Sequence, residues 1–152
     1  MQKVIISDTS CIVQLYLVGE LDILQKLFGQ VIITREIELE FRGKLPEWFS
    51  VSSPANKTYQ KILEATVDKG EASAIALAVE YEDVLLIMDD LKGRKLAHEL
   101  GINIIGTLGI VVDAKLKGHL ASVRNCIEDF KRTGFRISSE LEQIILQKSG
   151  EL

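Results

Sequence analysis

The sequence predicts an α/β fold built on a central, mostly parallel sheet. Short runs of β-branched residues alternate along the chain with helical stretches, and these runs are continuously apolar. Alternation of the two element types is typical of βαβ units, and continuously apolar strands are typical of a sheet that helices cover on both faces. The 152 residues, 47% of them hydrophobic, suffice for one well-filled core, so we expect a single domain over residues 1–152.

The expected elements follow from apolar periodicity and from the residues that start and stop helices. Strands are predicted at 4–6, 31–33, 49–52, 84–87 and 102–105. Helices are predicted at 11–18, 22–28, 35–41, 57–67, 71–81, 92–100 and 108–117. Thr34 is expected to cap the third helix, and Gly19 and Gly29 to end the first two. Two last helices, over about 122–148, are expected to pack on the domain, the second starting with a capping box at 139–142.

The charge and the hydropathy of the chain limit where the protein can be located and what it can bind. The chain carries 18 basic and 22 acidic side chains, which argues against binding nucleic acid through a broad basic surface. No apolar run approaches the roughly 20 residues that cross a bilayer, and the first run, at 4–6, is too short for a secretion signal. We therefore expect no membrane contact and a cytoplasmic location.

The cysteines and histidines do not predict a zinc site. Cys11 and Cys126 lie far apart in apolar segments, as buried thiols of a reducing compartment do. His98 and His119 lie in polar segments without a second ligand at a zinc-like spacing. A metal site in this chain would therefore depend on carboxylates.

Acidic residues directly follow two of the predicted strands. Asp8 comes after the strand at 4–6, and the pair Asp89–Asp90 comes after the strand at 84–87. Ligands of parallel sheets bind at the carboxyl ends of the strands, so we expect these three acids at one edge of the domain. Asp8 alone could be a helix N-cap, but two adjacent acids at a second strand end repel each other unless a cation offsets their charge.

Two glutamates are further candidates, and their spacing leaves their roles open. Glu40 shares a helix with Glu36 and Glu38, and all three could form a solvated face. Glu71 begins an alanine-rich helix, where the helix dipole alone favours an acid. Spacing does not choose between these structural roles and a place in an acidic site.

An oxygen-only cluster of carboxylates would select Mg²⁺ or Mn²⁺ over Zn²⁺. Such sites hold ions against phosphate oxygens and activate a water molecule. The hydroxyl groups of Thr9, Ser10 and Thr107 are expected to cap helices and to orient a carboxylate or the water. Arg94 and Lys95 follow the acid pair and are candidate contacts for RNA phosphates.

The order of these motifs resembles that of PIN domains. The motifs are Asp8-Thr9-Ser10, Glu40, Gly70-Glu71-Ala72, Met88-Asp89-Asp90 and Gly106-Thr107. The segment 70–118 is particularly similar to the VapC-type toxin branch of that family, and the resemblance extends from residue 4 to about residue 145.

The resemblance implies a Rossmann-like three-layer α/β/α fold and an Mg²⁺- or Mn²⁺-dependent endoribonuclease that is the toxin of a toxin–antitoxin pair. It implies metal ligands at Asp8, Glu40, Glu71, Asp89 and Asp90, with Asp90 in the usual place of the last acid and Asp89 beside it. It further implies an RNA substrate, a cognate antitoxin protein and a homodimer. The doubled acid and the position of Glu71 at a helix start depart from the commoner pattern of the family.

Other functions fit the residues less well. A phosphatase of the haloacid dehalogenase class needs a second aspartate two residues after Asp8, where this chain has Ser10. A response-regulator receiver needs a lysine after its last strand, but Lys115 and Lys117 lie deep in a predicted helix. A PIN-like module that binds RNA or protein without cleaving is the remaining alternative. The complete set of acids favours catalysis over that alternative.

Overall fold

The computed structural model describes residues 3–152, and its described strands form one parallel sheet in the order β3-β2-β1-β4-β5. The strands are β1 (Val4–Ser7), β2 (Val31–Ile33), β3 (Phe49–Val51), β4 (Val84–Ile87) and β5 (Asn103–Ile105). Each lies within one residue of a predicted strand. The predicted α/β class is therefore confirmed, with every strand pair parallel.

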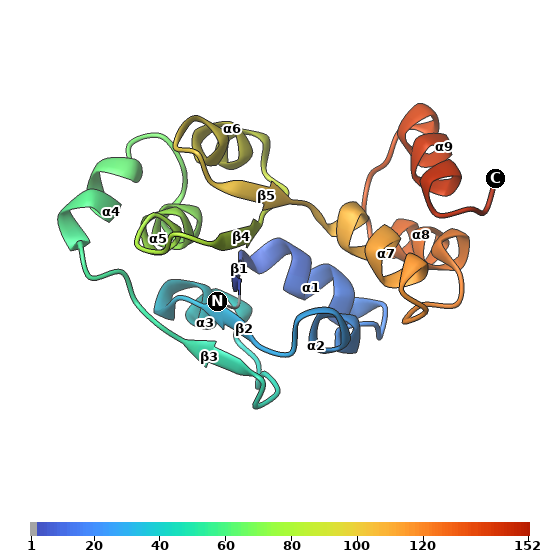
Figure 1. Ribbon diagram of the computed structural model, residues 1–152, viewed down its shortest axis with the longest axis horizontal. Coiled ribbons are helices and arrows are strands. Elements are labelled where there is room, and N and C mark those ends of the chain that lie inside the picture. Colours follow the sequence, from blue (N-terminus) through green and yellow to red (C-terminus); the bar gives the residue numbers. More distant parts are fainter. Residues whose placement is uncertain (1–2) are drawn as a thin grey trace.

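Helices cover both faces of the sheet, which gives the expected three-layer α/β/α arrangement (Figure 1). They are α1 (Thr9–Leu17), α2 (Asp22–Phe28), α3 (Arg35–Phe41), α4 (Lys57–Leu63), α5 (Lys69–Ala78), α6 (Leu91–Glu99), α7 (Thr107–Leu116), α8 (Val123–Arg132) and α9 (Ser139–Lys148). Helices α5 and α6 lie on one face, with α4 outside α5, and α1, α2 and α7 lie on the other. The last two helices, α8 and α9, both contact α7.

The path of the chain through the sheet reverses at β1. From β1 the chain proceeds to β2 and β3 on one side, and it then crosses to β4 and β5 on the other. Ser7 of β1 pairs with Ile87 of β4, so the residues that follow these strands leave the sheet side by side. Such a switch point, at the carboxyl ends of two parallel strands, opens a crevice in which open α/β sheets bind their ligands.

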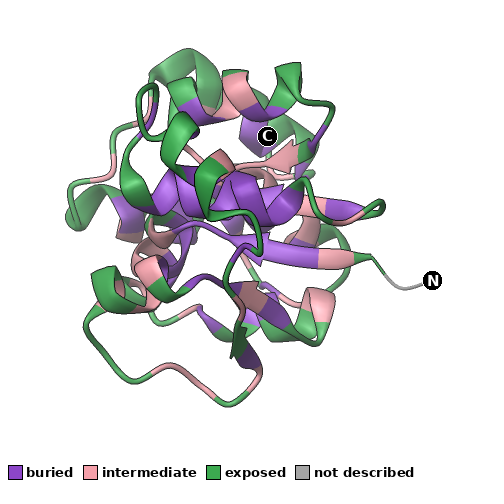
Figure 2. Cartoon of the chain, turned by 90° about the vertical axis from the view of Figure 1, so that its left-hand side faces the viewer, coloured by how far each residue is buried: buried purple, intermediate pink, exposed green. Residues whose placement is uncertain are grey.

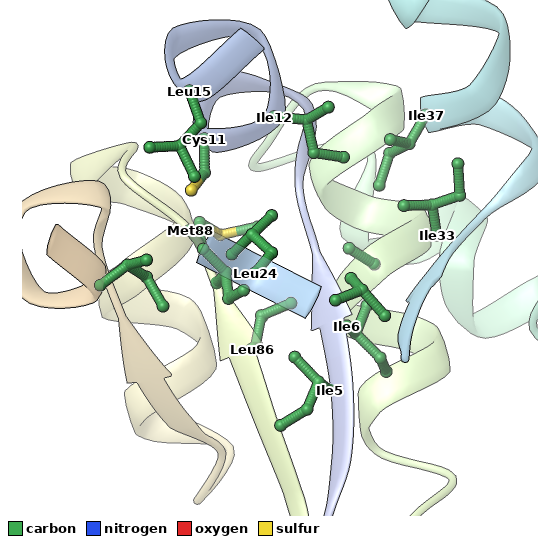
Figure 3. Close-up of a cluster of buried hydrophobic side chains, with 14 of the residues drawn as sticks. Ile5, Ile6, Cys11, Ile12, Leu15, Leu24, Ile33, Ile37, Leu86 and Met88 are labelled. Carbon is green, nitrogen blue, oxygen red and sulfur yellow. The ribbon is translucent and has the colours of Figure 1, made fainter. Parts of the chain in front are cut away.

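The core explains why the strands are continuously apolar. Ile5 and Ile6 are both buried, although neighbouring side chains of a strand point to opposite faces. Figure 3 shows Ile12 of α1 and Leu24 of α2 among the side chains of the core. On the other face, α5 is buried from Gly70 to Ala78, and its small side chains let it lie close to the strands. Buried residues concentrate on the sheet and on the helix surfaces turned towards it (Figure 2).

Some helix limits differ from the prediction. The predicted capping box at 139–142 is wrong, because Ser138 is the N-cap of α9 and accepts a hydrogen bond of 3.1 Å from the backbone N–H of Leu141. Ser138 and Ser139 could each cap this helix, and in the structure Ser138 is the N-cap and Ser139 is the first helical residue. A capping box occurs instead at the start of α5, between Asp68 and Glu71. Helix α4 ends at Leu63, before the predicted limit, because residues 64–66 form turns.

Two further expectations concern the thiols and the hydropathy. Cys11 and Cys126 are buried free thiols, as the sequence predicts. Within residues 3–152, no helix combines the length and the apolar character needed to cross a membrane.

Candidate functional site

Asp8 lies where β1 ends, at the switch point of the sheet. Its backbone N–H donates to the carbonyl oxygen of Ile87 at 2.9 Å, which fastens it to the end of β4. Asp8 is the N-cap residue of α1, but its side chain makes no capping hydrogen bond. The carboxylate is only 4% exposed, so capping does not explain why an acid is buried there.

The surroundings of Asp8 disfavour its negative charge. The pKa of the Asp8 carboxyl is raised to about 7, mainly by burial, and a hydrogen bond from the backbone of Thr9 offsets only part of that rise. The neighbouring charges of Asp68, Glu40 and Asp89 also contribute to the raised pKa. Four acids from four separate segments of the chain therefore face one another here.

Glu71 is the second buried acid of this group. Its backbone N–H donates to Asp68 Oδ1 at 2.8 Å, and its Oε1 accepts from the backbone N–H of Asp68 at 3.1 Å. Burial raises the pKa of Glu71 to about 7, and the charges of Asp68, Asp8 and Asp90 add to the rise. Glu71 thus has the structural role of a capping-box acid and also lies within reach of the charges of the other acids.

Asp68 belongs to this group although the sequence analysis did not select it. It is the N-cap of α5, and its charge acts on both Asp8 and Glu71. The spacing of Asp68 and Glu71 is the signature of a capping box, with Asp in place of Ser or Thr. That signature predicts the start of α5 at Lys69 and places a further carboxylate beside Glu71.

Glu40 is positioned by a close approach of α3 to α5. The Thr9 hydroxyl donates to Glu40 Oε1 at 2.6 Å. A Cβ atom on Gly70 would lie 2.3 Å from the same oxygen, so only glycine leaves room for the Glu40 carboxylate. A pair of buried hydroxyl groups also joins the two helices. The Thr34 hydroxyl, which caps α3, is 2.6 Å from the Ser73 hydroxyl of α5. The Ser73 hydroxyl in turn donates to the Gly70 carbonyl at 2.7 Å. These buried hydrogen bonds hold the starts of the two helices together.

The other glutamates of α3 do not take part in this approach. Glu38 forms a surface ion pair with Arg35, with 2.5 Å between its Oε1 and the guanidinium. Glu36 is half-buried, and its Oε2 has no hydrogen-bond partner among the described residues. Glu38 and Glu40 thus lie at the surface, as a solvated face would place them, and Glu40 differs from its neighbours in its hydrogen bond with Thr9.

The Asp89–Asp90 pair is divided between two helices. Asp89 accepts from the backbone N–H of Thr107 at 2.7 Å and from its hydroxyl at 2.5 Å, which fastens Asp89 to the start of α7. Asp90 is the N-cap of α6 and accepts from the backbone N–H of Gly93 at 3.0 Å. The charge of Asp89 acts on Asp8, and that of Asp90 acts on Glu71. Both acids therefore face the cluster, and Asp90 as the direct ligand stays a prediction.

The remaining candidates lie at different distances from the acids. Ser10 is exposed on α1. Arg94 turns back towards the end of β4, where its Nη1 donates to the Met88 carbonyl at 3.0 Å. Lys95 lies on another side of α6, in a hollow that it shares with Thr66 and Glu99. Arg94 is thus adjacent to the acids, whereas Lys95 is directed elsewhere.

The acids of this site fit a hard divalent cation by their chemistry and charge. The cluster consists of Asp8, Glu40, Asp68, Glu71, Asp89 and Asp90, and it contains oxygen donors only. Cys11 lies beneath it, and burial raises its pKa to about 12, so no thiolate competes with the carboxylates. Within the described residues, no three His, Cys, Asp or Glu side chains are already arranged as a metal cage. Several of these carboxylates instead accept hydrogen bonds from helix starts, and they would have to turn to share a cation.

Comparison with known protein families agrees with this geometry. A sequence-family model described as a PIN domain matches residues 4–151. The chain belongs to the PIN-domain family. No curated protein matches the chain significantly. PIN domains are generally nucleases that use divalent metal ions, so this PIN domain has a nuclease-type fold with an acidic cluster at its switch point.

Proposed function

We propose that this PIN domain is an Mg²⁺- or Mn²⁺-dependent endoribonuclease that hydrolyses RNA phosphodiester bonds. The observation that carries the proposal is the group of six acids around the switch point of the sheet, where Asp68, Glu40 and Asp89 act on the buried Asp8 and Asp90 acts on Glu71. A folded chain does not gain stability from placing like charges beside the buried carboxylates of Asp8 and Glu71, so such a cluster indicates a function that needs them.

The metal ligands of the proposed enzyme are Asp8, Glu40, Glu71, Asp89 and Asp90, with Asp68 beside them. When bound, a divalent cation supplies positive charge that offsets the carboxylates and polarises a phosphate group. Thr9 donates to Glu40, and Thr107 donates to Asp89, so these hydrogen bonds keep two of the carboxylates close to the site.

The test is a cleavage assay on labelled single-stranded RNA, with Mn²⁺ or with EDTA. We expect cleavage by the natural chain that EDTA abolishes, and a loss of at least about a hundredfold in the Asp8→Asn variant, which keeps the shape but removes the charge. Asp83→Asn is the matched control, because Asp83 lies at the opposite end of β4 in a surface ion pair with Lys3. Cleavage that ignores EDTA, or that Asp8→Asn leaves intact, would contradict the proposal.

The same assay separates the proposed enzyme from the alternatives. RNA binding without cleavage by the natural chain would favour a non-catalytic RNA-binding module. Equal cleavage of single-stranded DNA of the same sequence would contradict the assignment to RNA.

We further propose that the protein acts in the cytoplasm as the VapC-type toxin of a toxin–antitoxin pair and forms a homodimer. The motif order over residues 70–118 supports the toxin assignment. A short reading frame for a DNA-binding protein beside the gene, whose product blocks cleavage when co-expressed, is the expected outcome. Sedimentation of the purified chain tests the dimer.

A further inference from the structure

We infer that a groove beside Asp89 binds one unpaired nucleotide of the RNA substrate, next to the phosphate that is cleaved. This inference rests on the proposed function, and it adds a binding site outside the carboxylate cluster. The groove lies between the start of α7 and α9, and it has a volume of about 700 Å³. We name it the α7–α9 groove; Leu108, Gly109, Phe135, Arg136, Leu141 and Ile145 line it, together with Asp89 and Arg94.

The groove adjoins the acidic site because the two share Asp89. Asp89 belongs to both the cluster and the groove lining. A Cβ atom on Gly106 would lie 2.8 Å from Asp89 Oδ1 and 3.0 Å from Arg94 Nη1. The glycine therefore lets the carboxylate and the guanidinium approach each other over the start of α7. A phosphate held by the acids and their cation would have its neighbouring nucleotide at this groove.

The walls of the groove have the chemistry that binds a nucleobase. Leu108 and Ile145 contribute apolar side chains from α7 and α9. Phe135 packs against Phe130 with 5.1 Å between the ring centroids, which fixes its ring while it still lines the groove. Unpaired bases stack on such aromatic side chains, and each stacked base contributes about 1–3 kcal/mol to binding.

The charges of the groove also favour RNA. Among residues 3–152, neither Arg94 nor Arg136 has a carboxylate within 4.0 Å, although both line a groove beside an acidic cluster. A chain of net charge −4 thus presents two unpaired guanidinium groups at this position. Guanidinium groups bind phosphate oxygens and base edges, so Arg94 and Arg136 give charge complementarity for a nucleotide to a groove that is otherwise lined mostly by apolar side chains.

The size of the groove favours an unpaired nucleotide over a duplex. A cavity of several hundred Å³ accommodates a single small-molecule ligand, such as one nucleotide. Bases within a duplex are stacked on each other and cannot enter it. Single-stranded RNA or a loop is therefore the expected substrate class.

The test measures binding of labelled single-stranded RNA to the full chain in EDTA, where cleavage is absent. We expect Phe135→Leu and Arg136→Gln each to weaken binding by about tenfold. Leucine keeps the apolar contact with Phe130 but removes the stacking surface. Arg132→Gln is the matched control, since Arg132 is an exposed arginine nearby that does not line the groove. Thermal unfolding of each variant checks that the fold is retained.

A second arm uses RNAs that each lack one base. If a base stacks on Phe135, one abasic position weakens binding to the natural chain but has no further effect on Phe135→Leu. Duplex RNA of the same sequence is not expected to compete. These results, together with cleavage at or next to that position, would support the inference.

Other outcomes overturn the inference in distinguishable ways. If the natural chain cleaves RNA and the groove variants bind it as tightly, the groove inference fails and the nuclease proposal stands. If the groove variants lose binding but no RNA is ever cleaved, the groove inference stands and the nuclease proposal fails. If no RNA is bound or cleaved, both fail. If Phe135→Leu converts a dimer into a monomer with RNA binding unchanged, a second copy of the chain occupies the groove and the inference is wrong.

Discussion

At the scale of single residues, Asp8 shows a conflict between stability and function. Its carboxyl group is withdrawn from water, and three other acids face it. None of the described salt bridges involves an acid of the cluster, although Arg94 lies near Asp89. Without a bound cation, the folded chain must either carry this repulsion or keep a proton on the cluster.

This conflict predicts a pH dependence of stability in EDTA. The pKa of Asp8 is about 7 in the folded chain and 3.8 for an unperturbed aspartate, so the folded state binds the proton more tightly than the unfolded state. The contribution of Asp8 to stability is therefore complete below about pH 4 and is lost as the pH rises towards 7. The raised pKa of Glu71 makes stability fall with rising pH in the same way.

We expect Asp8→Asn to remove the part of this dependence that is due to Asp8, leaving the part due to Glu71, and to stabilise the metal-free chain at pH 8 by an amount on the order of 1–4 kcal/mol. Urea unfolding at pH 5 and pH 8 in EDTA measures the effect, with Asp83→Asn as the control. Equal slopes of stability against pH for the natural chain and Asp8→Asn would show that Asp8 ionises normally.

At the scale of elements, the site depends on the distance between α3 and α5. Gly70 sits at the start of α5 against the Glu40 carboxylate, and the buried hydroxyl pair of Thr34 and Ser73 fixes the approach from below. The sequence could not reveal this approach, because Glu36, Glu38 and Glu40 are equally spaced along α3. The resemblance to PIN domains selects Glu40, and the packing of α3 against α5 gives it a position that Glu36 and Glu38 lack.

Gly70→Ala is expected to separate activity from stability. The new methyl group would displace the Glu40 carboxylate, and a displacement of about 1 Å costs on the order of a hundredfold in rate. Alanine is also a better helix former than glycine, so the free energy of unfolding should change by less than about 1 kcal/mol. Cleavage kinetics and urea unfolding measure the two effects.

The double variant Gly70→Ala with Glu40→Asp tests the steric explanation. The shorter aspartate leaves room for the methyl group, so the two substitutions should cost less together than the sum of their separate effects. Strict additivity of the two effects on the rate would mean that the methyl group acts in some other way.

The elements themselves were largely accessible from the sequence. All five strands and the order of the helices follow from apolar runs and capping residues, because burial on both faces leaves a strong pattern in short segments. Asp8 and the Asp89–Asp90 pair follow from strand ends alone. Asp68 was overlooked although its capping-box spacing was visible, and the α7–α9 groove has no signature, because it forms where distant segments meet.

At the scale of the whole molecule, cation binding should be visible as added stability. A ligand that binds only the folded state at a hundred times its Kd adds about 2.7 kcal/mol. For a domain of this size, that gain corresponds to a rise of roughly 5–10 °C in Tm.

We expect Mn²⁺ to raise the Tm of the natural chain and of Asp83→Asn, but to have little effect on Asp8→Asn. Differential scanning calorimetry at pH 7.5, with EDTA as the reference, measures the shift. An equal rise in Asp8→Asn would place the bound ion away from the acidic cluster.

The acids of the cluster come from four separate parts of the chain, ending with Asp89 and Asp90. A cation shared by them would act as a reversible crosslink between the ends of β1 and β4 and the helices α3 and α5. Like other crosslinks, it would stabilise the fold mainly by suppressing local opening, because the joined segments could no longer separate independently. Amide hydrogen exchange at the end of α3 and the start of α5 would then slow together when the ion binds, although these segments are far apart in the sequence.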